Sequence, residues 1–395
     1  MRIGLRCAGE RVLIYPNLLQ RPIRVAVYSG EMRPFNPTTG VNKHMENMLG
    51  AMVLQPDFDV RFYVPREEWA RDQSCPPSGF SSAIPSVRLP ISRRRMLVNS
   101  LTPCGAPFET YAPDADWVYA PRELLCSTRT AKFAVTIHDI YNFEPERRER
   151  FNPRQAFQYY RWSQAIARAR TVFTVSQFTK ERICEVFGGD AEKIVVVGNG
   201  VAPLYFDMAS MEPEAVTPLP GIVYYVSVGG VTRKKGGRRL LQFALRLERT
   251  SPDQRLVVIG LVEREFQPDI AALRNLMVIP HGLADADIAK WVRGSTAMLC
   301  FSEYEGFGIP AAEAMAAGVP VVAHRQGALV EVLGDAGMII DADSPSQLND
   351  ALSLARDPTL RNGMIKRGYA RAARLRWKRC AETLVQAFRN TGSGP

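Results

Sequence analysis

Long apolar runs are missing from this 395-residue sequence, and so are paired cysteines. No stretch approaches the roughly 18–20 consecutive apolar residues that a membrane-spanning helix needs, which excludes a helical membrane-spanning protein. The seven cysteines are scattered and form no Cys-x-x-Cys pair, so neither a disulfide framework nor a zinc site is predicted. The first twenty residues lack the apolar core and small-residue cleavage site of a secretory signal. We therefore expect a cytoplasmic protein.

Positive charge is unevenly distributed along the chain. The formal net charge is +10, and residues 1–200 hold 27 lysines and arginines against 20 acidic residues. The surplus includes one run of three arginines and two more in an aromatic-rich segment: Arg93, Arg94, Arg95, Arg154 and Arg161. A basic surface with aromatic side chains can bind an anionic membrane or a diphosphate lipid. A solvated basic face is the alternative, and the sequence leaves both open.

Short β-branched runs alternate with helical patterns along the whole chain, which predicts parallel, doubly wound sheets. The predicted strands are Ile23–Tyr28, Asp59–Val64, Ala134–Ile137, Val172–Val175, Ile194–Val197, Val223–Val228, Leu256–Ile259, Leu276–Ile279, Ala297–Phe301 and Val319–Ala323. A helix capped by Ser176 is predicted to run to about Phe187. The fold class is therefore α/β.

A proline-rich segment without a clear period divides this pattern into two halves. We predict a first domain over residues 1–202, a linker over 203–221 and a second domain over 222–374. The last segment, 375–395, is predicted to be a helix that packs back toward the first domain. Two such halves form a cleft between them, and ligands bind at the carboxyl ends of the strands.

The segment SEYEGFGIPAAEAMAAGVPVV, residues 302–322, holds two carboxylates around a glycine turn. Gly306 and Gly308 allow close backbone approach and unusual dihedral angles. A carboxylate can accept two hydrogen bonds from a vicinal diol, and the N–H groups of a helix start can bind phosphate. Glu305 and Glu313 therefore indicate a nucleotide-sugar site. The alternative is that Glu313 only interacts with the helix dipole and that Glu305 is solvated.

Several segments together resemble glycosyltransferase family 4, a retaining family with the GT-B fold. The strings are TIHDIYNFEPE, TVSQFTKERICEVFGGDAEKIVVVGNGV, VSVGGVTRKKGG, SEYEGFGIPAAEAMAAGVPVVAHRQGALVEVLGDAGMIID and RLRWKRCAETLVQAF. The resemblance covers about residues 130–390 well and 23–60 weakly. It implies two Rossmann-like, doubly wound domains that face a central cleft.

The resemblance implies three catalytic residues. Glu305 matches the acid at the transferred sugar, and His138 matches the histidine of the first domain near that sugar, with Asp139 beside it. The resemblance also implies that the acceptor attacks the donor from the front face with help from the leaving phosphate. His138 would then position a substrate and need not be a base. A hydrogen-bonded core histidine is the alternative for His138.

The resemblance also implies the donor-binding residues. Glu313 matches the ribose-binding acid and Lys235 the lysine that neutralises the diphosphate. Lys234 stands where the family usually has arginine, so whether Arg233 or Lys234 holds the diphosphate stays open. The remaining positions are Gly40, Gly306, Phe307 and Gly308. No Asp-x-Asp motif stands where a metal-dependent transferase needs one, so we predict no metal and no cofactor.

The sequence as a whole predicts a retaining, metal-independent glycosyltransferase. It would move a hexose, with mannose from GDP-mannose as the leading donor, to a glycan or a polyprenyl-diphosphate-linked acceptor in polysaccharide or lipopolysaccharide synthesis. The alternatives are a UDP-sugar-dependent transferase, a nucleotide-sugar epimerase and a nucleic-acid-binding protein. No nucleic-acid-binding motif is present, so no nucleic acid partner is predicted. The basic residues predict a peripheral position at the inner face of the plasma membrane.

Overall fold

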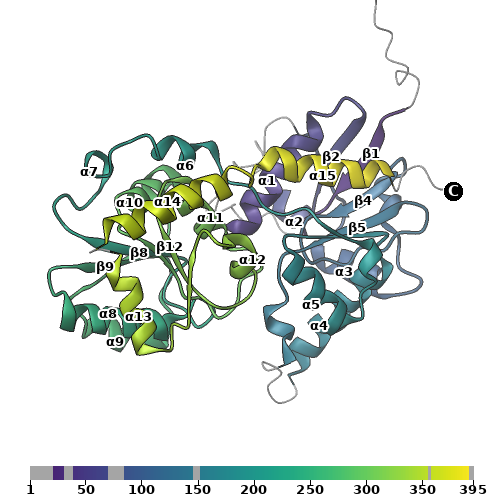
Figure 1. Ribbon diagram of the computed structural model, residues 1–395. Helices are drawn as coiled ribbons and strands as arrows, with labels where there is room; N and C mark the ends of the chain where they lie inside the picture. Colours follow the sequence, from purple (N-terminus) through teal and green to yellow (C-terminus); the bar gives the residue numbers. More distant parts are fainter. Residues whose placement is uncertain (1–20, 31–38, 70–83, 146–151, 355–356, 391–395) are drawn as a thin grey trace, which may run out of the picture.

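The chain folds into two lobes that lie side by side, each built around one parallel β-sheet (Figure 1). This computed structural model describes residues 21–30, 39–69, 84–145, 152–354 and 357–390. The prediction of two doubly wound α/β domains is confirmed. Residues 1–20 and the first five residues of the basic segment 147–170 lie outside the described residues.

The first sheet contains seven parallel strands. In spatial order they are β3 (Ser86–Arg88), β2 (Phe58–Val64), β1 (Ile23–Val27), β4 (Trp117–Ala120), β5 (Lys132–Ile137), β6 (Thr171–Thr174) and β7 (Ile194–Val196). One face is covered by α1 (Gly40–Val53) and α15 (Trp377–Asn390). The other is covered by α3 (Arg93–Leu101), α4 (Pro153–Arg168) and α5 (Gln177–Phe187). A short helix, α2 (Arg66–Trp69), follows β2.

The second sheet repeats this order with six parallel strands. They are β10 (Leu276–Ile279), β9 (Arg255–Ile259), β8 (Tyr224–Val228), β11 (Met298–Cys300), β12 (Val321–His324) and β13 (Met338–Ile340). One face packs on α8 (Gly237–Thr250), α9 (Gln267–Ala271) and α13 (Pro345–Ser353). The other packs on α10 (Asp285–Arg293), α11 (Ile309–Ala316), α12 (Leu329–Leu333) and the end of α14 (Pro358–Ala372).

Both sheets have the strand order of dinucleotide-binding proteins, in which the order reverses between the first and the fourth strand. In the first lobe the reversal lies between β1 and β4, and in the second lobe between β8 and β11. Crossovers at such a point leave from opposite faces of the sheet, so a crevice opens outside the carboxyl ends of the two strands. Each lobe therefore has a built-in place for a ligand.

The sequence located ten of these strands and missed three. β3 and β13 have only three residues each, too few to show a period. β4, with the sequence WVYA, has a single β-branched residue among its four positions and so does not stand out as a β-branched run. The predicted cap of α5 is confirmed, because the Oγ of Ser176 accepts a hydrogen bond from the backbone N–H of Thr179 at 3.0 Å.

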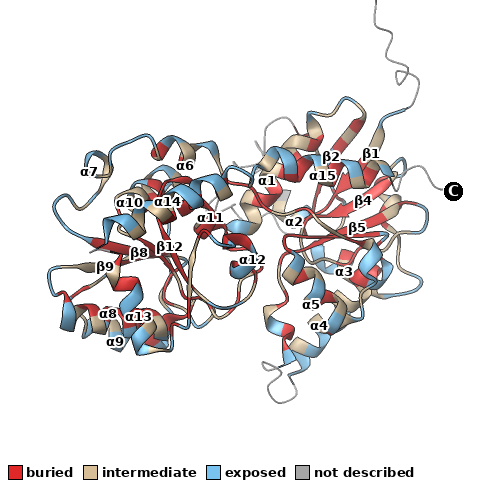
Figure 2. Ribbon diagram, viewed as in Figure 1, coloured by how far each residue is buried: buried red, intermediate tan, exposed pale blue. Residues whose placement is uncertain are grey.

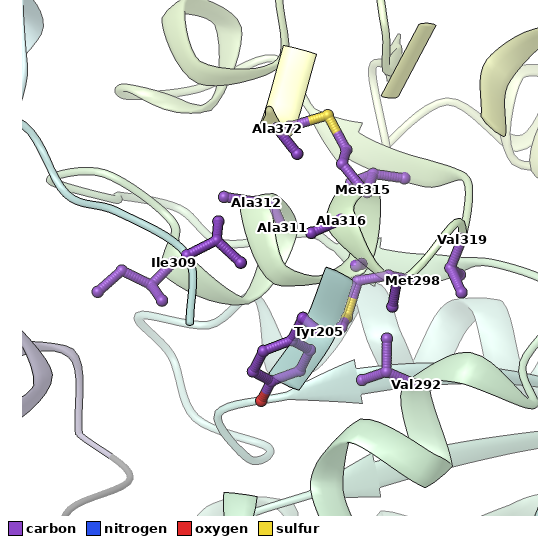
Figure 3. Packing of buried hydrophobic residues seen from close by; sticks show 14 of the residues in the cluster. Tyr205, Val292, Met298, Ile309, Ala311, Ala312, Met315, Ala316, Val319 and Ala372 are labelled. Atoms are coloured by element: carbon purple, nitrogen blue, oxygen red, sulfur yellow. The ribbon is translucent and has the colours of Figure 1, made fainter. Parts of the chain in front are cut away.

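The segment predicted as a linker contains two short helices, α6 (Pro203–Met208) and α7 (Pro213–Val216). Both begin with proline, which suits the first helical turn. Neither is long enough to show an apolar period in the sequence. Tyr205 of α6 is fully buried and belongs to the same apolar cluster as Met298 and Ile309 of the second lobe (Figure 3). The segment therefore packs on the second lobe, and the predicted domain boundaries themselves stay a prediction.

Among the described helices of the second lobe, α11 is the most deeply buried. Figures 2 and 3 show it surrounded by other elements, with its alanines against neighbouring side chains. Ala311, Ala312 and Ala316 are fully buried, and their small size lets the helix lie close to the sheet and to Ala372 of α14. A carboxylate on such a helix needs a partner, because an isolated charge is costly to bury.

The last helix, α15, packs on the first lobe although the second lobe precedes it in the chain (Figure 1). Its Phe388 ring meets Trp117, Tyr119 and Phe173 of the first sheet, with ring centroids 4.9, 5.5 and 5.3 Å away. Arg389 forms an ion pair with Asp57 at 2.7 Å. None of the described helices is long and apolar enough to cross a membrane.

His44 of α1 should make the stability of the protein depend on pH. It is fully buried, its Nδ1–H donates to Asn199 Oδ1 at 2.8 Å, and its Nε2 has no hydrogen-bond partner among the described residues. Burial, together with the nearby His138, lowers the pKa of His44 from 6.5 to about 3. As the pH falls below about 6.5, His44 therefore becomes protonated in the unfolded chain but stays neutral in the folded chain. This difference lowers the free energy of unfolding.

We expect this histidine to cost about 2 kcal/mol of unfolding free energy between pH 7 and pH 5. Urea unfolding at the two pH values measures the loss, and His44→Gln is the control because glutamine can still donate to Asn199 but does not titrate. An equal loss in the wild type and in His44→Gln would show that other groups cause the pH dependence.

Candidate active site

A cavity of about 380 Å³ lies between the two lobes. The second lobe contributes the carboxyl ends of β8, β9 and β10 and the loop after β11, and the first lobe contributes the start of α1 and the loop after β5. Nine of the predicted site residues line it: Gly40, His138, Asp139, Lys234, Lys235, Glu305, Gly306, Phe307 and Gly308. The structure therefore gathers most of the residues that the resemblance implied, and the switch point of the second sheet borders their cavity.

A larger hollow of about 820 Å³ lies elsewhere, between α15 and the edge of the first sheet. It contains Arg170 and Thr171, which stand at the amino end of β6, and it has both acidic and basic side chains at its rim. Since ligands of doubly wound sheets bind at the carboxyl ends of the strands, the smaller cavity between the lobes is the better candidate.

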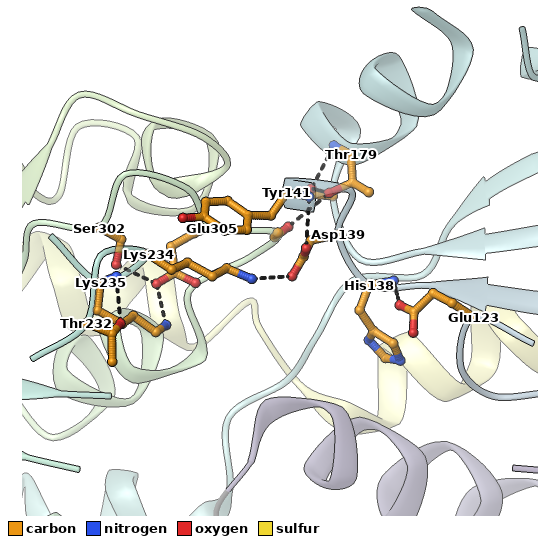
Figure 4. Close-up of polar contacts among 12 residues, drawn as sticks. Glu123, His138, Asp139, Tyr141, Thr179, Thr232, Lys234, Lys235, Ser302 and Glu305 are labelled. Carbon is orange, nitrogen blue, oxygen red and sulfur yellow. Dashed lines mark hydrogen bonds and ion pairs between the residues drawn. The ribbon is translucent and has the colours of Figure 1, made fainter. Parts of the chain in front are cut away.

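Lys235 and Glu305 form the charged centre of this cavity (Figure 4). The Nζ of Lys235 lies 2.6 Å from Glu305 Oε1, which also accepts a hydrogen bond from Ser302 Oγ at 2.7 Å. Burial alone would lower the pKa of Lys235, but the Glu305 carboxylate outweighs this effect and raises it. The cavity therefore holds a fixed positive charge beside a carboxylate.

Glycines bring the basic turn close to the neighbouring strand. Gly236 has a φ of +72°, and a Cβ on it would lie 1.9 Å from the carbonyl oxygen of Phe301. Gly229 has a φ of +126° and lies against the side chain of Lys235. The positive φ values disfavour other residues at both positions, and at Gly236 the backbone contact excludes a Cβ as well. Gly229 therefore leaves room for the Lys235 side chain, and Gly236 lets the basic turn lie against the strand end at Phe301.

Lys234 reaches across the cleft to the first lobe (Figure 4). Its Nζ lies 2.7 Å from Asp139 Oδ2 and 5.0 Å from the centre of the Tyr141 ring. The other oxygen of Asp139 accepts from the backbone N–H of Tyr141 at 3.1 Å, which fixes the carboxylate. Arg233 instead turns outward and pairs with Glu265, outside the cavity. The structure therefore places Lys234, and not Arg233, at the cavity.

Glu313 does not line the cavity in this structure. Its buried carboxylate lies 2.6 Å from the Nζ of Lys43, which also contacts Asp285 Oδ2 at 3.1 Å. Burial would lower the pKa of Lys43, but Glu313 and then Asp285 outweigh this effect and raise it. The ribose-binding role of Glu313 therefore requires this pair to open.

Lys43 is a charged residue between the lobes that the sequence analysis did not single out. It stands three positions after Gly40, in the first turn of α1, and its side chain is only 11% exposed. A lysine beside an implied phosphate-binding glycine could have drawn attention. Its partner could not have been found, because Glu313 lies 270 positions away on the other lobe.

Gly306 lies directly against the first lobe. A Cβ on this residue would lie 2.1 Å from the carbonyl oxygen of His138. His138 is buried, its ring Nε2 lies 3.1 Å from the carbonyl oxygen of Pro121, and its backbone N–H donates to Glu123 Oε1 at 2.8 Å (Figure 4). His138 is therefore a hydrogen-bonded, buried histidine that also lines the cavity, and its role in positioning a substrate stays a prediction.

Two further contacts hold the lobes together beside the cavity. The carboxylate of Glu331 in α12 accepts the backbone N–H groups of Gln177 and Phe178, each at 3.0 Å, at the start of α5. The Tyr304 ring of the second lobe packs in the apolar cluster of the first, 5.3 Å from Phe178 and 5.8 Å from Tyr141. The cavity is thus bordered by a contact surface between the lobes.

One group of metal-ligating side chains comes together in the described part of the chain: His324, Asp341 and Asp343. It does not line the cavity. Asp343 pairs with Arg239 at 2.7 Å, and the Nδ1 of His324 accepts the backbone N–H of Ala342 at 3.1 Å. These atoms already have partners, so the group is a poor fit for a metal ion, and the expectation of a metal-independent site stays a prediction.

Two doubly wound lobes around one cleft, with lysines and acidic side chains at the strand ends, define the GT-B class of glycosyltransferases. Two family models match the chain. The model "Glycosyltransferase Family 4" matches residues 38–203, and "Glycosyl transferases group 1" matches residues 220–371. The chain belongs to glycosyltransferase family 4.

Relatives and solved structures agree with this assignment. The chain is 27% identical to O-antigen chain mannosyltransferase B of Escherichia coli over 69% of this chain and 74% of that protein. It is also 27% identical to a D-inositol 3-phosphate glycosyltransferase of Acidothermus cellulolyticus, over 57% of this chain and 54% of the relative, so it spans about half of that protein.

Two solved structures share the fold at low identity. WaaG, described as a glycosyltransferase involved in lipopolysaccharide biosynthesis, has a TM-score of 0.69 at 16% identity over 94% of this chain and all of that chain. Anabaena HepE, solved in complex with UDP and glucose, has a TM-score of 0.67 at 16% identity over 93% of this chain and all of that chain. The GT-B fold is therefore confirmed.

Proposed function

We propose that this protein is a retaining, metal-independent hexosyltransferase that uses a nucleotide sugar, with GDP-mannose as the leading donor. The acceptor is a glycan or a polyprenyl-diphosphate-linked sugar of cell-surface polysaccharide or lipopolysaccharide synthesis. The observation that carries the proposal is the Lys235–Glu305 pair in the cavity between the lobes. The names of the mannosyltransferase relatives support mannose. UDP sugars are the second candidate, because the structure of HepE contains UDP and glucose.

The proposed reaction forms one carbon–oxygen bond and breaks another. An acceptor hydroxyl oxygen attacks the anomeric carbon on the face that the diphosphate leaves. The bond to the diphosphate breaks, its electron pair stays on the phosphate oxygen, and the hydroxyl proton moves to that oxygen. Lys235 and Lys234 stabilise the charge that develops there. Glu305 accepts hydrogen bonds from the sugar hydroxyls, and His138 keeps the loop of the first lobe against the donor.

Glu313→Gln should weaken donor binding. In the proposed complex the carboxylate of Glu313 leaves Lys43 and accepts the ribose hydroxyls, and a hydrogen bond to a charged group contributes about 1.5–3 kcal/mol. We therefore expect the KM for the donor to rise at least about tenfold with a smaller effect on kcat. Asp285→Asn is the matched control, because it removes the other partner of Lys43 and leaves Glu313. An unchanged KM in Glu313→Gln would reject the ribose-binding role.

A thermal-shift panel of GDP, UDP, GDP-mannose and UDP-glucose tests the donor. Stabilisation by GDP-mannose above that by UDP-glucose is expected, and a larger shift with UDP than with GDP would reject mannose.

Transfer should continue in the presence of EDTA. Loss of activity with EDTA and its return with Mg²⁺ or Mn²⁺ would reject the metal-independent reaction. Conversion of the donor in the absence of any acceptor would instead identify an epimerase.

We also propose that the protein binds the anionic inner face of the plasma membrane through α3 and α4. Val98, Phe157 and Tyr160 expose 47%, 47% and 46% of their surface on these helices. Exposed arginines flank them: Arg94, Arg95 and Arg154. Large exposed apolar side chains among basic ones are typical of membrane-surface helices. Sedimentation with phosphatidylglycerol vesicles tests this, and binding should fall when Phe157 and Tyr160 are both replaced by serine; absence of binding by the wild type would reject it.

A further inference from the structure

A second cavity, of about 350 Å³, lies within the first lobe at the reversal point of its sheet. Tyr28, Ser29 and Gly30 follow β1, and residues 122–125 follow β4; both segments line this cavity. The other walls come from α3 and α4. A doubly wound sheet binds ligands at this point, and the volume is within the range of about 300–1,000 Å³ that small-molecule sites have.

Among the described residues, four arginines line the cavity together with one carboxylate, that of Glu123. The arginines are Arg93, Arg94, Arg122 and Arg161. The Nε of Arg161 is buried and has no hydrogen-bond partner among the described residues. A buried donor without a partner is costly, so not every donor of this guanidinium is satisfied within the described residues. The lining thus has the charge and the donors that phosphate recognition requires.

The start of α3 adds to the positive field. Its first turn contains Arg93, Arg94 and Arg95 and no acidic residue, at the end of the helix where the macrodipole is already positive. Glu67 Oε1 accepts the backbone N–H of Arg93 at 2.7 Å and offsets part of this charge. Burial, and then the positive charge of the nearby Arg93, lowers the pKa of the Arg161 guanidinium.

This basic cavity adjoins the donor cavity through one short segment. Glu123 lines the basic cavity, and its Oε1 accepts the backbone N–H of His138, which lines the donor cavity. The carbonyl oxygen of Pro121 lies 3.1 Å from Nε2 of the same histidine. A molecule held in the basic cavity therefore lies on the first-lobe side of the donor, where an acceptor must approach.

We propose that the basic cavity binds the phosphate or diphosphate group of the acceptor and that the acceptor is a phosphorylated molecule. This inference rests on the proposed function for the word acceptor, but the anion site itself does not. The arginines hold the anionic group, and the acceptor hydroxyl extends past Pro121 toward the donor sugar. Arg93 and Arg94, read from the sequence as membrane contacts, take part in substrate recognition, whereas Arg154 stays on the outer surface of α4.

Titration of the whole protein with inorganic phosphate, followed by calorimetry, tests the site. Arg161→Gln should weaken phosphate binding about tenfold, because it removes a charge-assisted contact. Arg94→Gln, on the exposed start of α3, should weaken it in the same direction and guards against misfolding of the first variant. Arg154→Gln is the matched control, seven positions before Arg161 on the same helix and outside the cavity lining, and should bind phosphate as the wild type does.

Two comparisons keep this inference separate from the proposed function. Lys235→Met removes a cation of the donor cavity and should leave phosphate binding to the basic cavity in place. Arg161→Gln should leave the thermal shift with GDP-mannose or UDP-glucose unchanged. Wild-type phosphate affinity in both Arg161→Gln and Arg94→Gln would overturn the inference, even if the donor panel succeeds. Failure of the donor panel would overturn the proposed function while the phosphate titration still reports on the cavity.

Vesicles distinguish a lipid phosphate from a soluble one. The vesicles contain phosphatidylcholine with or without phosphatidic acid, and inorganic phosphate is added as competitor. Displacement from the phosphatidic acid vesicles by phosphate, lost in Arg161→Gln and kept in Arg154→Gln, assigns the site to a lipid-linked phosphate. Phosphate binding that Arg161→Gln weakens, without any competition at the vesicles, assigns it to a soluble phosphorylated acceptor. Vesicle binding that Arg154→Gln and Arg161→Gln weaken equally, with phosphate affinity unchanged, would leave only surface adsorption and reject the site.

Discussion

Replacing Lys235 by methionine should lower kcat/KM for sugar transfer by about 10²–10³-fold, the loss typical of removing one group that stabilises a developing oxyanion. The methionine keeps the length of the side chain and removes its charge. The reason for so large an effect is the position of the Lys235 Nζ, 2.6 Å from Glu305 Oε1 in the cavity between the lobes. Without the lysine, Glu305 would repel the diphosphate that the same cavity must bind.

Three consecutive basic residues provide a matched series for this prediction. Arg233→Met should leave activity nearly unchanged, because the Arg233 side chain is 66% exposed and pairs with Glu265 outside the cavity. Lys234→Met should have an intermediate effect, since it removes both a cation and the contact to Asp139. Initial rates with saturating acceptor measure all three. A loss in Arg233→Met as large as that in Lys235→Met would show that the structure places the phosphate contact at the wrong residue.

Replacing Gly306 by alanine should reduce activity by about 10²-fold while the protein stays folded. The new Cβ would lie 2.1 Å from the carbonyl oxygen of His138, a backbone atom that cannot turn away. The two lobes would have to separate by the missing distance, and the groups of the first lobe would move away from Glu305 and Lys235. A displacement of about 1 Å at the reacting atoms is enough for such a loss.

Gly50→Ala is the control for this steric effect. Gly50 lies in α1 with no atom within 4 Å of its added Cβ, so alanine should raise the unfolding free energy by up to about 1 kcal/mol and leave transfer unchanged. Small-angle scattering should show a slightly larger radius of gyration for Gly306→Ala than for the wild type. Full activity together with an unchanged radius of gyration in Gly306→Ala would show that the lobes do not meet at this glycine.

The predictions that held from sequence alone are those that depend on neighbouring residues. A buried strand such as β9 shows itself in four consecutive residues, LVVI, because burial on both faces demands an apolar side chain at each position. The two ends of α5 also depend on neighbouring residues, since Ser176 at the start and Gly188 after the last turn interact with backbone groups of the adjacent turn.

The partners of the charged residues were beyond the sequence. Asp139 and Lys234 are 95 positions apart, and Lys43 and Glu313 are 270 apart, so no periodicity connects them. Each pair exists only because the two lobes meet in one orientation. The same holds for the four arginines that line the first-lobe cavity, because they come from α3, α4 and the loop after β4 and only the fold brings them together.

What the amino-acid order determined by itself was therefore the fold class, most strands, and the identity of the residues that gather at the cleft. The tertiary structure decided which of them face the cleft, namely Lys234 and not Arg233, and that Glu313 is held by Lys43. It also decided that Arg161 lines a separate cavity of the first lobe. The physical reason is range. Hydrophobic burial and capping act between near neighbours in the chain, whereas an ion pair or a cavity depends on how separate elements pack.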